Sequence, residues 1–186
     1  MDITAHSIAL ISIIVGLGLT EMFGNLHRLI RNRARVSWDF LPLAWAATLF
    51  VVVLNYWWAV YLGLDGSHQA RTAAEFGLIL APPLLLFLAT ASVLPNFEPG
   101  GDWDMRAHYQ AQRRVFILTF AIYQISTFTT VLLVGGLGWN FLSIVRAVIF
   151  LLLVSMLFIN RRLWDWAAVL AILVFLFIRL TTQVVR

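Results

Sequence analysis

The sequence predicts an all-α membrane protein, a bundle of six transmembrane helices with both chain termini on the outer side of the membrane. The first observation is composition: of 186 residues, 61% are hydrophobic and 12% are charged, and the mean hydropathy is +0.88. A water-soluble domain is only about half apolar. Second, six apolar stretches are each close to the roughly 20 residues that a helix needs to cross a bilayer. Third, the connections between them are alternately rich and poor in arginine, which is typical of a polytopic membrane protein.

The predicted helices follow one another closely, so residues 1–186 form a single transmembrane domain. We place them at residues 8–29, 40–62, 74–94, 115–137, 140–159 and 164–184. The longest connection, residues 95–114, begins with a turn rich in proline and glycine and continues as a polar run. We expect this polar run either to extend the fourth helix into the cytoplasm or to lie along the lipid headgroups.

The arginines define an orientation. The first, third and fifth connections carry nine of them, namely Arg28, Arg31, Arg33, Arg35, Arg106, Arg113, Arg114, Arg161 and Arg162. The second and fourth connections carry only Arg71. Because basic residues are retained on the cytoplasmic side of a membrane, the odd-numbered connections are predicted to be cytoplasmic and both termini to be outside.

Composition excludes several classes of function. The chain has no cysteine, so disulfides, thiolate metal sites and iron-sulfur clusters are excluded. It also has no lysine, and a retinal or pyridoxal Schiff base needs a lysine amine. The net charge of +4 lies at helix ends rather than on a continuous basic face, so we expect no nucleic-acid partner. We find no nucleophile motif and no metal-ligand spacing, and we therefore predict no metal, no cofactor and no enzymatic activity.

Each arginine-rich connection contains a Trp-Asp pair. The pairs are Trp38-Asp39, Trp103-Asp104 and Trp164-Asp165. They are compatible with three duplicated helical hairpins, a common plan in membrane transporters. The alternative, which we favour, is that Trp prefers the membrane interface and Asp prefers the first turn of a helix, so that the pair arises independently at each cytoplasmic helix start.

Glu21 is the clearest single candidate for a functional residue, because it lies about 10 Å inside the cytoplasmic end of the first helix. A charged group inside a bilayer is a functional candidate by default. Beside it Gly16, Thr20 and Gly24 recur every four residues and suit close packing between helices, whereas Asn25 and Arg28 continue the face of Glu21 itself. We expect Glu21 to point into the bundle as a structural clasp; the alternative is a protonatable or cation-binding site.

The second intramembrane charge is Arg146, roughly 9 Å below the outer end of the fifth helix. At a similar depth the third helix carries Pro82 and Pro83, which are expected to kink the helix and to leave carbonyls one turn earlier without their helical donors. We predict that Arg146 donates hydrogen bonds to these carbonyls or to Asn55 of the second helix. The alternative is that Arg146 extends to a lipid phosphate.

The fourth helix carries a line of polar residues in which Tyr123 and Gln124 lie near the level of Glu21. The line also contains Thr119, Ser126, Thr127 and Thr130. Two interpretations remain open: a narrow hydrated path, or hydroxyl groups that bond to their own helix or to a neighbour.

The segment from Gly16 to Thr20, the sequence Leu26-His27-Arg28-Leu29 and the start of the second helix resemble small uncharacterised multipass proteins found in bacteria. The resemblance covers the first third of the chain. It implies the bacterial inner membrane as location and implies no activity.

We interpret the chain as an accessory or scaffold subunit that is surrounded by membrane lipids. It would pack against another membrane protein or against itself through the small-residue face of the first helix and the connection at residues 95–114. The alternative is a small transporter or channel with an inner site at Glu21, Tyr123 and Gln124 and an outer site at Arg146 and Asn55. A third interpretation is a binder of lipid, quinone or pigment.

Overall fold

The computed structural model describes residues 3–61, 72–96, 102–135 and 141–183, and these form a helical bundle. The helices are α1 (Ile3–Arg31), α2 (Phe40–Tyr61), α3 (Ala73–Ser92), α4 (Met105–Gly135), α5 (Phe141–Phe158) and α6 (Arg162–Gln183). A short 3-10 helix, η1 (Arg33–Arg35), and two strands of two residues each, β1 (Val36–Ser37) and β2 (Trp103–Asp104), lie in the connections. The prediction of an all-α fold is confirmed.

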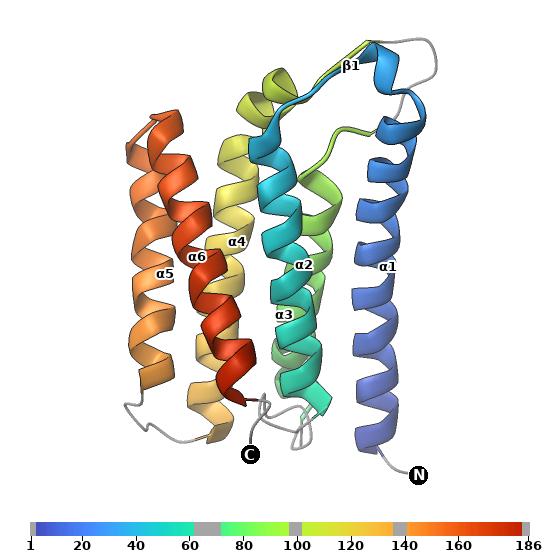
Figure 1. Ribbon diagram of the computed structural model, residues 1–186. Coiled ribbons are helices and arrows are strands. Elements are labelled where there is room, and N and C mark those ends of the chain that lie inside the picture. Colours follow the sequence, from blue (N-terminus) through green and yellow to red (C-terminus); the bar gives the residue numbers. More distant parts are fainter. Residues whose placement is uncertain (1–2, 62–71, 97–101, 136–140, 184–186) are drawn as a thin grey trace.

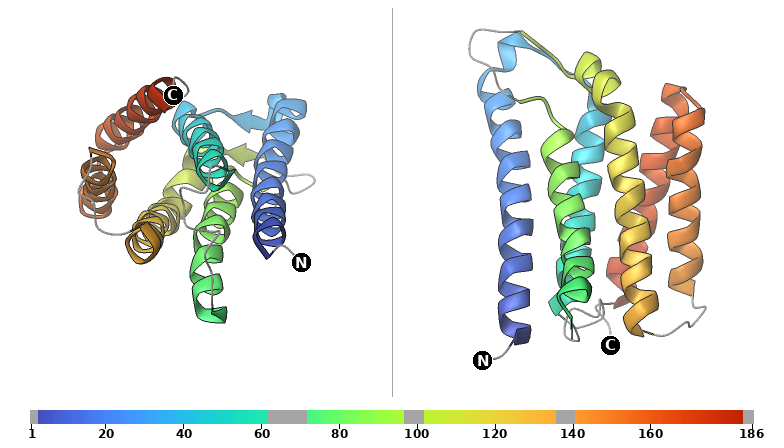
Figure 2. Two further views of the ribbon diagram at one scale, coloured as in Figure 1. Left: turned by 90° about the horizontal axis from the view of Figure 1, so that it is seen from below. Right: turned by 180° about the vertical axis from the view of Figure 1, so that it is seen from behind.

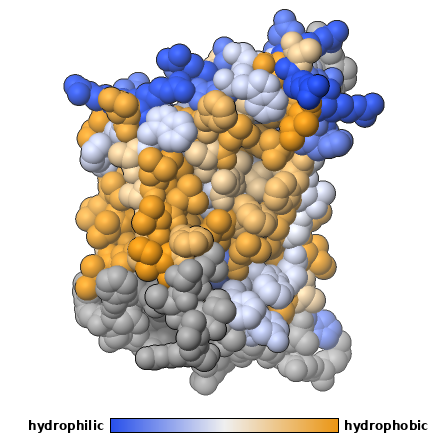
Figure 3. Space-filling view, viewed as in Figure 1, coloured by the Kyte–Doolittle hydropathy of each residue, from blue (hydrophilic) through white to orange (hydrophobic). Residues whose placement is uncertain are grey.

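Among the described residues, three helices are long and apolar enough to cross a membrane, over His6–Arg31, Phe40–Tyr61 and Ala73–Ser92, and α5 contributes a shorter apolar segment, Ile144–Phe158. The outer surface agrees, because large apolar side chains such as Phe40 (74% exposed) and Leu163 (83% exposed) face away from the bundle. Figure 3 shows the resulting apolar band below a hydrophilic end. This surface fits a bundle that is surrounded by lipid tails.

The helices run side by side, with α1 at one edge of the bundle and α5 and α6 at the other (Figures 1 and 2). Helix α1 packs against α3 and α2, α4 packs between α3 and α5, and α6 packs against α2 and α5. The beginning of α1 and the end of α6 lie at the same end of the bundle. At the opposite end, α1 ends and α2, α4 and α6 begin. We call this the arginine-rich end, because it exposes Arg31, Arg33, Arg35, Arg106, Arg114 and Arg161.

Two of the Trp-Asp aspartates cap helices at the arginine-rich end. Asp39 Oδ1 accepts a hydrogen bond of 2.9 Å from the backbone N–H of Leu41 at the start of α2. Asp104 Oδ1 accepts bonds from the N–H groups of Arg106 and Ala107 at the start of α4. Both contacts satisfy amide groups that have no partner within their own helix, and they agree with the helix-start interpretation of the motif.

The cap at Asp104 also explains why α4 begins ten residues earlier than the apolar stretch alone predicts. The polar run before residue 115 is helical, so the interpretation of an extended fourth helix is confirmed. The connection before α4 is held against the connection before α2 by a parallel pairing of β1 with β2, in which Val36 lies opposite Trp103. These contacts fix the two connections across the end of the bundle.

Aromatic side chains form the centre of the bundle between α2 and α4. Trp45 is fully buried, and its ring meets those of Phe116 and Phe120 edge-on at centroid distances of 5.1 and 6.2 Å. In α3, Pro82 and Pro83 are both buried inside the helix. Helix α3 therefore continues past the two prolines.

Candidate functional site

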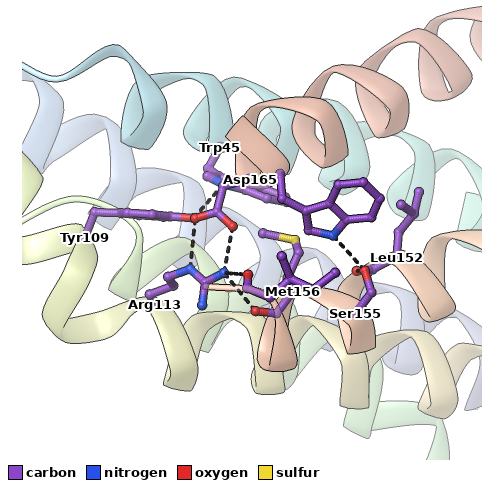
Figure 4. Close-up of polar contacts among 9 residues, drawn as sticks. Trp45, Tyr109, Arg113, Leu152, Ser155, Met156 and Asp165 are labelled. Carbon is purple, nitrogen blue, oxygen red and sulfur yellow. Dashed lines mark hydrogen bonds and ion pairs between the residues drawn. The ribbon is translucent and has the colours of Figure 1, made fainter. Parts of the chain in front are cut away.

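The most strongly organised polar site lies at the arginine-rich end, where Arg113 of α4 meets Asp165 of α6 (Figure 4). Arg113 Nε donates to Asp165 Oδ2 at 2.8 Å, and Arg113 Nη2 donates to Asp165 Oδ1 at 2.7 Å. Both side chains are buried, with 7% and 4% of their surface exposed. This is a bidentate ion pair, the geometry in which a guanidinium binds a carboxylate most strongly.

The same guanidinium reaches the end of a third helix. Arg113 Nη2 donates to the carbonyl oxygens of Met156 and Ile159 at 2.8 and 3.0 Å. These carbonyls lie at the C-terminal end of α5, where backbone acceptors lack partners within the helix and where the helix dipole favours a positive charge. Asp165 in turn lies in the first turn of α6, where the dipole favours a negative charge. The ion pair thus complements both helix ends.

Two aromatic side chains extend the network to α2. Tyr109 Oη donates to Asp165 Oδ2, and Trp45 Nε1 donates to Tyr109 Oη, both at 3.2 Å. Burial, reinforced by the neighbouring Asp165 carboxylate, raises the pKa of Tyr109, so the phenol keeps the proton that it donates. The hydrogen bond to Asp165 raises the pKa of Arg113, which keeps the guanidinium charged. We call Trp45, Tyr109, Arg113 and Asp165 the four-helix clasp, because their contacts join α2, α4, α5 and α6.

A second polar cluster joins α1 to the chain segment after α3. Asn25 is buried, and its Nδ2 donates to Asn96 Oδ1 at 3.1 Å and to Glu21 Oε1 at 3.4 Å. Arg28 Nη1 donates to Asn25 Oδ1 at 3.3 Å. The structure therefore brings together three predicted candidates, Glu21, Asn25 and Arg28.

The expected direction of Glu21 is wrong within the single chain. Glu21 is exposed, whereas Asn25, one turn further along α1, is buried. The buried side of α1 is set by large apolar residues such as Ile11, Val15 and Met22. Because successive residues in a helix are separated by 100°, Glu21 lies on the edge of the outward face.

Gly16, Thr20 and Gly24 make no close helix contact within the described part of the single chain. A methyl group added at Gly16 or Gly24 would meet nothing within 4 Å, and the exposed Thr20 donates to the carbonyl of Gly16. The close approach between α1 and α3 is instead at Gly18. A Cβ there would lie 2.6 Å from Thr90 Oγ1.

The predicted outer candidates are dispersed. Asn55 is buried, but its amide donates to Val51 of its own helix at 3.2 Å. Arg146 is half-buried on α5. Helix α5 packs mainly on α4 and α6 rather than on the proline-containing α3. A hydrogen bond between Arg146 and Asn55 is not among the contacts of the described residues.

The polar line on α4 is directed into packing contacts. Tyr123 is buried, stacks on Phe120 at 5.9 Å and meets Tyr56 edge-on at 6.3 Å. Three threonines donate to carbonyls of their own helix: Thr119 to Val115, Thr127 to Gln124 and Thr130 to Ser126. Gln124 is half-buried. The residues of the predicted inner transport site are thus divided between the outward face of α1 and the interior of the bundle.

Comparison with known proteins adds no further assignment. No family model, no curated protein and no solved structure matches the chain. Within the part of the chain that the structure describes, no group of three or more His, Asp or Glu side chains is placed to hold a metal ion. The clasp and the outward face of α1 are therefore the features from which function is inferred.

The four-helix clasp was not predicted from the sequence, although a signal exists. Arg113 follows the spacing of the buried face of α4, since Tyr109 precedes it by four residues and Phe116 and Ile117 follow it by three and four. An arginine in register with an apolar face indicates a buried charge that needs a partner. The third Trp-Asp pair supplies that partner.

Proposed function

We propose that this chain is a non-enzymatic accessory or scaffold subunit of the bacterial inner membrane, with six membrane spans and both termini outside. In this proposal α1 binds a helix of a neighbouring membrane protein or of a second copy. The observation that carries the proposal is the outward face of α1. Gly16, Thr20, Glu21 and Gly24 lie on that face, away from the rest of the bundle.

This face of α1 exposes large apolar side chains such as Ile13 and Leu17, as the other outward surfaces do, but it differs from them in the small residues between these side chains. Helix α3 presents Leu84 and Leu88 to the outside, and α6 presents Phe177. Large side chains of this kind fill the space between a protein and lipid tails, whereas small residues permit the close approach of another helix backbone. The middle of the outward face of α1 is therefore better suited to a helix than to lipid.

Glu21 supports the same conclusion. A charged side chain near the centre of a bilayer costs at least about 2.5 kcal/mol, and less nearer the interface. At about 10 Å from the cytoplasmic end of α1, a carboxylate that faces lipid bears part of this cost. A partner helix with a hydrogen-bond donor at that depth would reduce it.

The polar residues of the remaining helices favour a holding role over a transport role. The clasp directs its charged and aromatic groups to other helices, and Asn55 and the α4 threonines bond within their own helices. A transporter needs such groups to converge on a path. A scaffold needs them to fix the helix arrangement.

The test is a substitution that fills the outward face without touching the chain's own contacts. Because Cβ atoms at Gly16 and Gly24 meet nothing and leucine has the higher helix propensity, Gly16→Leu/Gly24→Leu should not lower the melting temperature of the isolated chain. We expect the double variant to lose the copurifying protein, or the dimer mass, in native mass spectra after mild solubilisation. The matched control is Gly77→Leu, on the exposed surface of α3, where a Cβ also meets nothing. Retention of the complex by the double variant, or a wild-type chain that carries only lipid, would contradict the proposal.

A further inference from the structure

The connection between α1 and α2 exposes a concentrated positive charge at the edge of the apolar band. Arg31 ends α1, and Arg33 and Arg35 lie in η1; all three side chains are exposed. The hydrophilic corner above the apolar band is visible in Figure 3, and η1 and β1 lie above α1 and α2 in Figure 1.

The described part of the chain does not neutralise this charge. None of these three guanidinium groups forms a hydrogen bond or ion pair with another described residue. Three carboxylates at this end have other partners: Asp165 pairs with Arg113, Asp39 pairs with Arg162, and Asp104 caps α4. The exposed Asp102, next to β2, forms no ion pair with a described residue. The three arginines therefore remain available to an external anion.

The connection is held in place, so its arginines have a fixed level relative to the helices. Strand β1, which follows Arg35 directly, pairs with β2, and Val36 is buried. Two exposed aromatic residues, Trp38 and Phe40, follow on the same connection at the start of α2. Tryptophan and other aromatic residues mark the membrane interface, where the chain passes from hydrocarbon to headgroups. Arginines in this position lie among lipid headgroups.

We propose that Arg31, Arg33 and Arg35, with Trp38 and Phe40 beside them, form a binding site for anionic phospholipid headgroups. The guanidinium groups would donate to phosphate oxygens, for which their planar donor geometry is suited. The aromatic rings would contact the upper acyl chains. A zwitterionic lipid carries a cation that opposes this binding, so the site prefers lipids with net negative charge. The inference does not depend on the proposed scaffold function.

The test compares lipid binding by two variants with the same loss of charge. Arg33→Gln/Arg35→Gln removes two arginines of the site, and the control Arg106→Gln/Arg114→Gln removes two exposed arginines of α4 at the same end. Binding of phosphatidylglycerol and phosphatidylcholine is titrated by native mass spectrometry of the full chain in a neutral detergent. We expect the site variant to bind phosphatidylglycerol roughly 25-fold more weakly, fivefold for each arginine, and the control to change less than fivefold.

Four outcomes would overturn the inference. An equal loss in both variants would leave only a general charge effect that sets membrane orientation. If the wild-type chain bound phosphatidylcholine as tightly as phosphatidylglycerol, the site would have no preference for anionic lipid. If inorganic phosphate bound as tightly as phosphatidylglycerol, the site would be one for free anions and not for lipid. If the site variant fails to fold, the salt dependence of phosphatidylglycerol binding by the wild-type chain tests the proposal instead. At 1 M salt the electrostatic screening length falls to about 3 Å, so this binding should weaken strongly. Salt-independent binding would contradict the proposal.

Discussion

Removing Arg113 should destabilise the bundle more than any other change at the arginine-rich end. Arg113→Met replaces the guanidinium by an apolar chain of similar length and leaves the Asp165 carboxylate buried, with Tyr109 as its remaining side-chain donor. In addition to the bonds to the carbonyls of Met156 and Ile159, two charge-assisted hydrogen bonds to the carboxylate, of 2.8 and 2.7 Å, are lost. At about 1.5–3 kcal/mol each, they give a loss of about 3–6 kcal/mol. Breaking a buried ion pair by removing one partner typically costs about 3–5 kcal/mol, in agreement with this sum.

Removing the charge of the partner, Asp165, should lower the free energy of unfolding less than Arg113→Met does. In Asp165→Asn the guanidinium keeps its backbone acceptors, the carbonyls of Met156 and Ile159, and an amide oxygen remains at position 165. In the double variant Arg113→Met/Asp165→Leu no buried charge is left, and apolar replacement of a whole ion pair is often close to neutral. We therefore expect the double variant to be more stable than Arg113→Met.

The free energy of unfolding can be measured in mixed micelles with rising fractions of a denaturing detergent, followed by the fluorescence of the eight tryptophans. Circular dichroism in the absence of denaturant serves as the control for retained helix. A loss under about 1 kcal/mol for Arg113→Met would refute a dominant role of the clasp. So would an Arg113→Met/Asp165→Leu variant whose loss equals the sum of the losses measured for Arg113→Met alone and for Asp165→Leu alone, because that result shows no coupling between the partners.

Three further predictions concern other contacts. Gly18→Leu should lower the free energy of unfolding by about 1–3 kcal/mol, because the added Cβ would lie 2.6 Å from Thr90 Oγ1. A variant as stable as the wild type would contradict this close approach of α1 to α3. Arg162→Gln should lower the free energy of unfolding by under about 1 kcal/mol, since the Arg162 side chain is 42% exposed. Asp39→Ala should lower it by about 1–2 kcal/mol, because this change also removes the cap of α2. The same denaturation assay checks both variants, and a larger loss for Arg162→Gln than for Asp39→Ala would be inconsistent with the structure. Burial lowers the pKa of His108, so the unfolded chain takes up a proton more readily below about pH 6.5 and stability should fall as pH falls through that value. In thermal melts at pH 7.5 and 5.5, His108→Gln should show a smaller decrease than the wild type, and an equal decrease would contradict this assignment.

The elements themselves were largely predictable. Helix α2 begins at residue 40 as predicted, α3 begins one residue before its predicted start, and α5 spans 141–158 against the predicted 140–159. These boundaries are marked by arginine, proline or glycine beside a continuous apolar run. The predicted start of α4 was wrong because hydropathy alone cannot identify a polar helical segment that follows a capping aspartate.

The direction in which each side chain points was far less predictable. In a water-soluble helix the apolar stripe identifies the buried face. Residues 8–19 of α1 are apolar on nearly all sides, so periodicity identifies a stripe of small residues but not whether it faces protein or lipid. Gly18 and Gly16 illustrate this: two positions apart, they lie on nearly opposite faces, and only Gly18 contacts α3. What decides between them is the shape of α3, including Phe87 and Thr90, and that information lies far along the chain.

The arginines at this end have two physically different roles that the positive-inside pattern does not separate. Arg113 meets a carboxylate and helix-end carbonyls within the bundle, so its charge stabilises the arrangement of helices. Arg33 and Arg35 are exposed and meet no carboxylate in the described chain, and in the proposed lipid site their charge is directed to the headgroup layer. The difference follows from geometry, because a guanidinium that projects from a packed face of α4 is withdrawn from water, whereas one in η1 remains outside the apolar band. Loss of Arg113 should therefore reduce stability in any detergent, whereas loss of Arg33 and Arg35 should change only the response to anionic lipid.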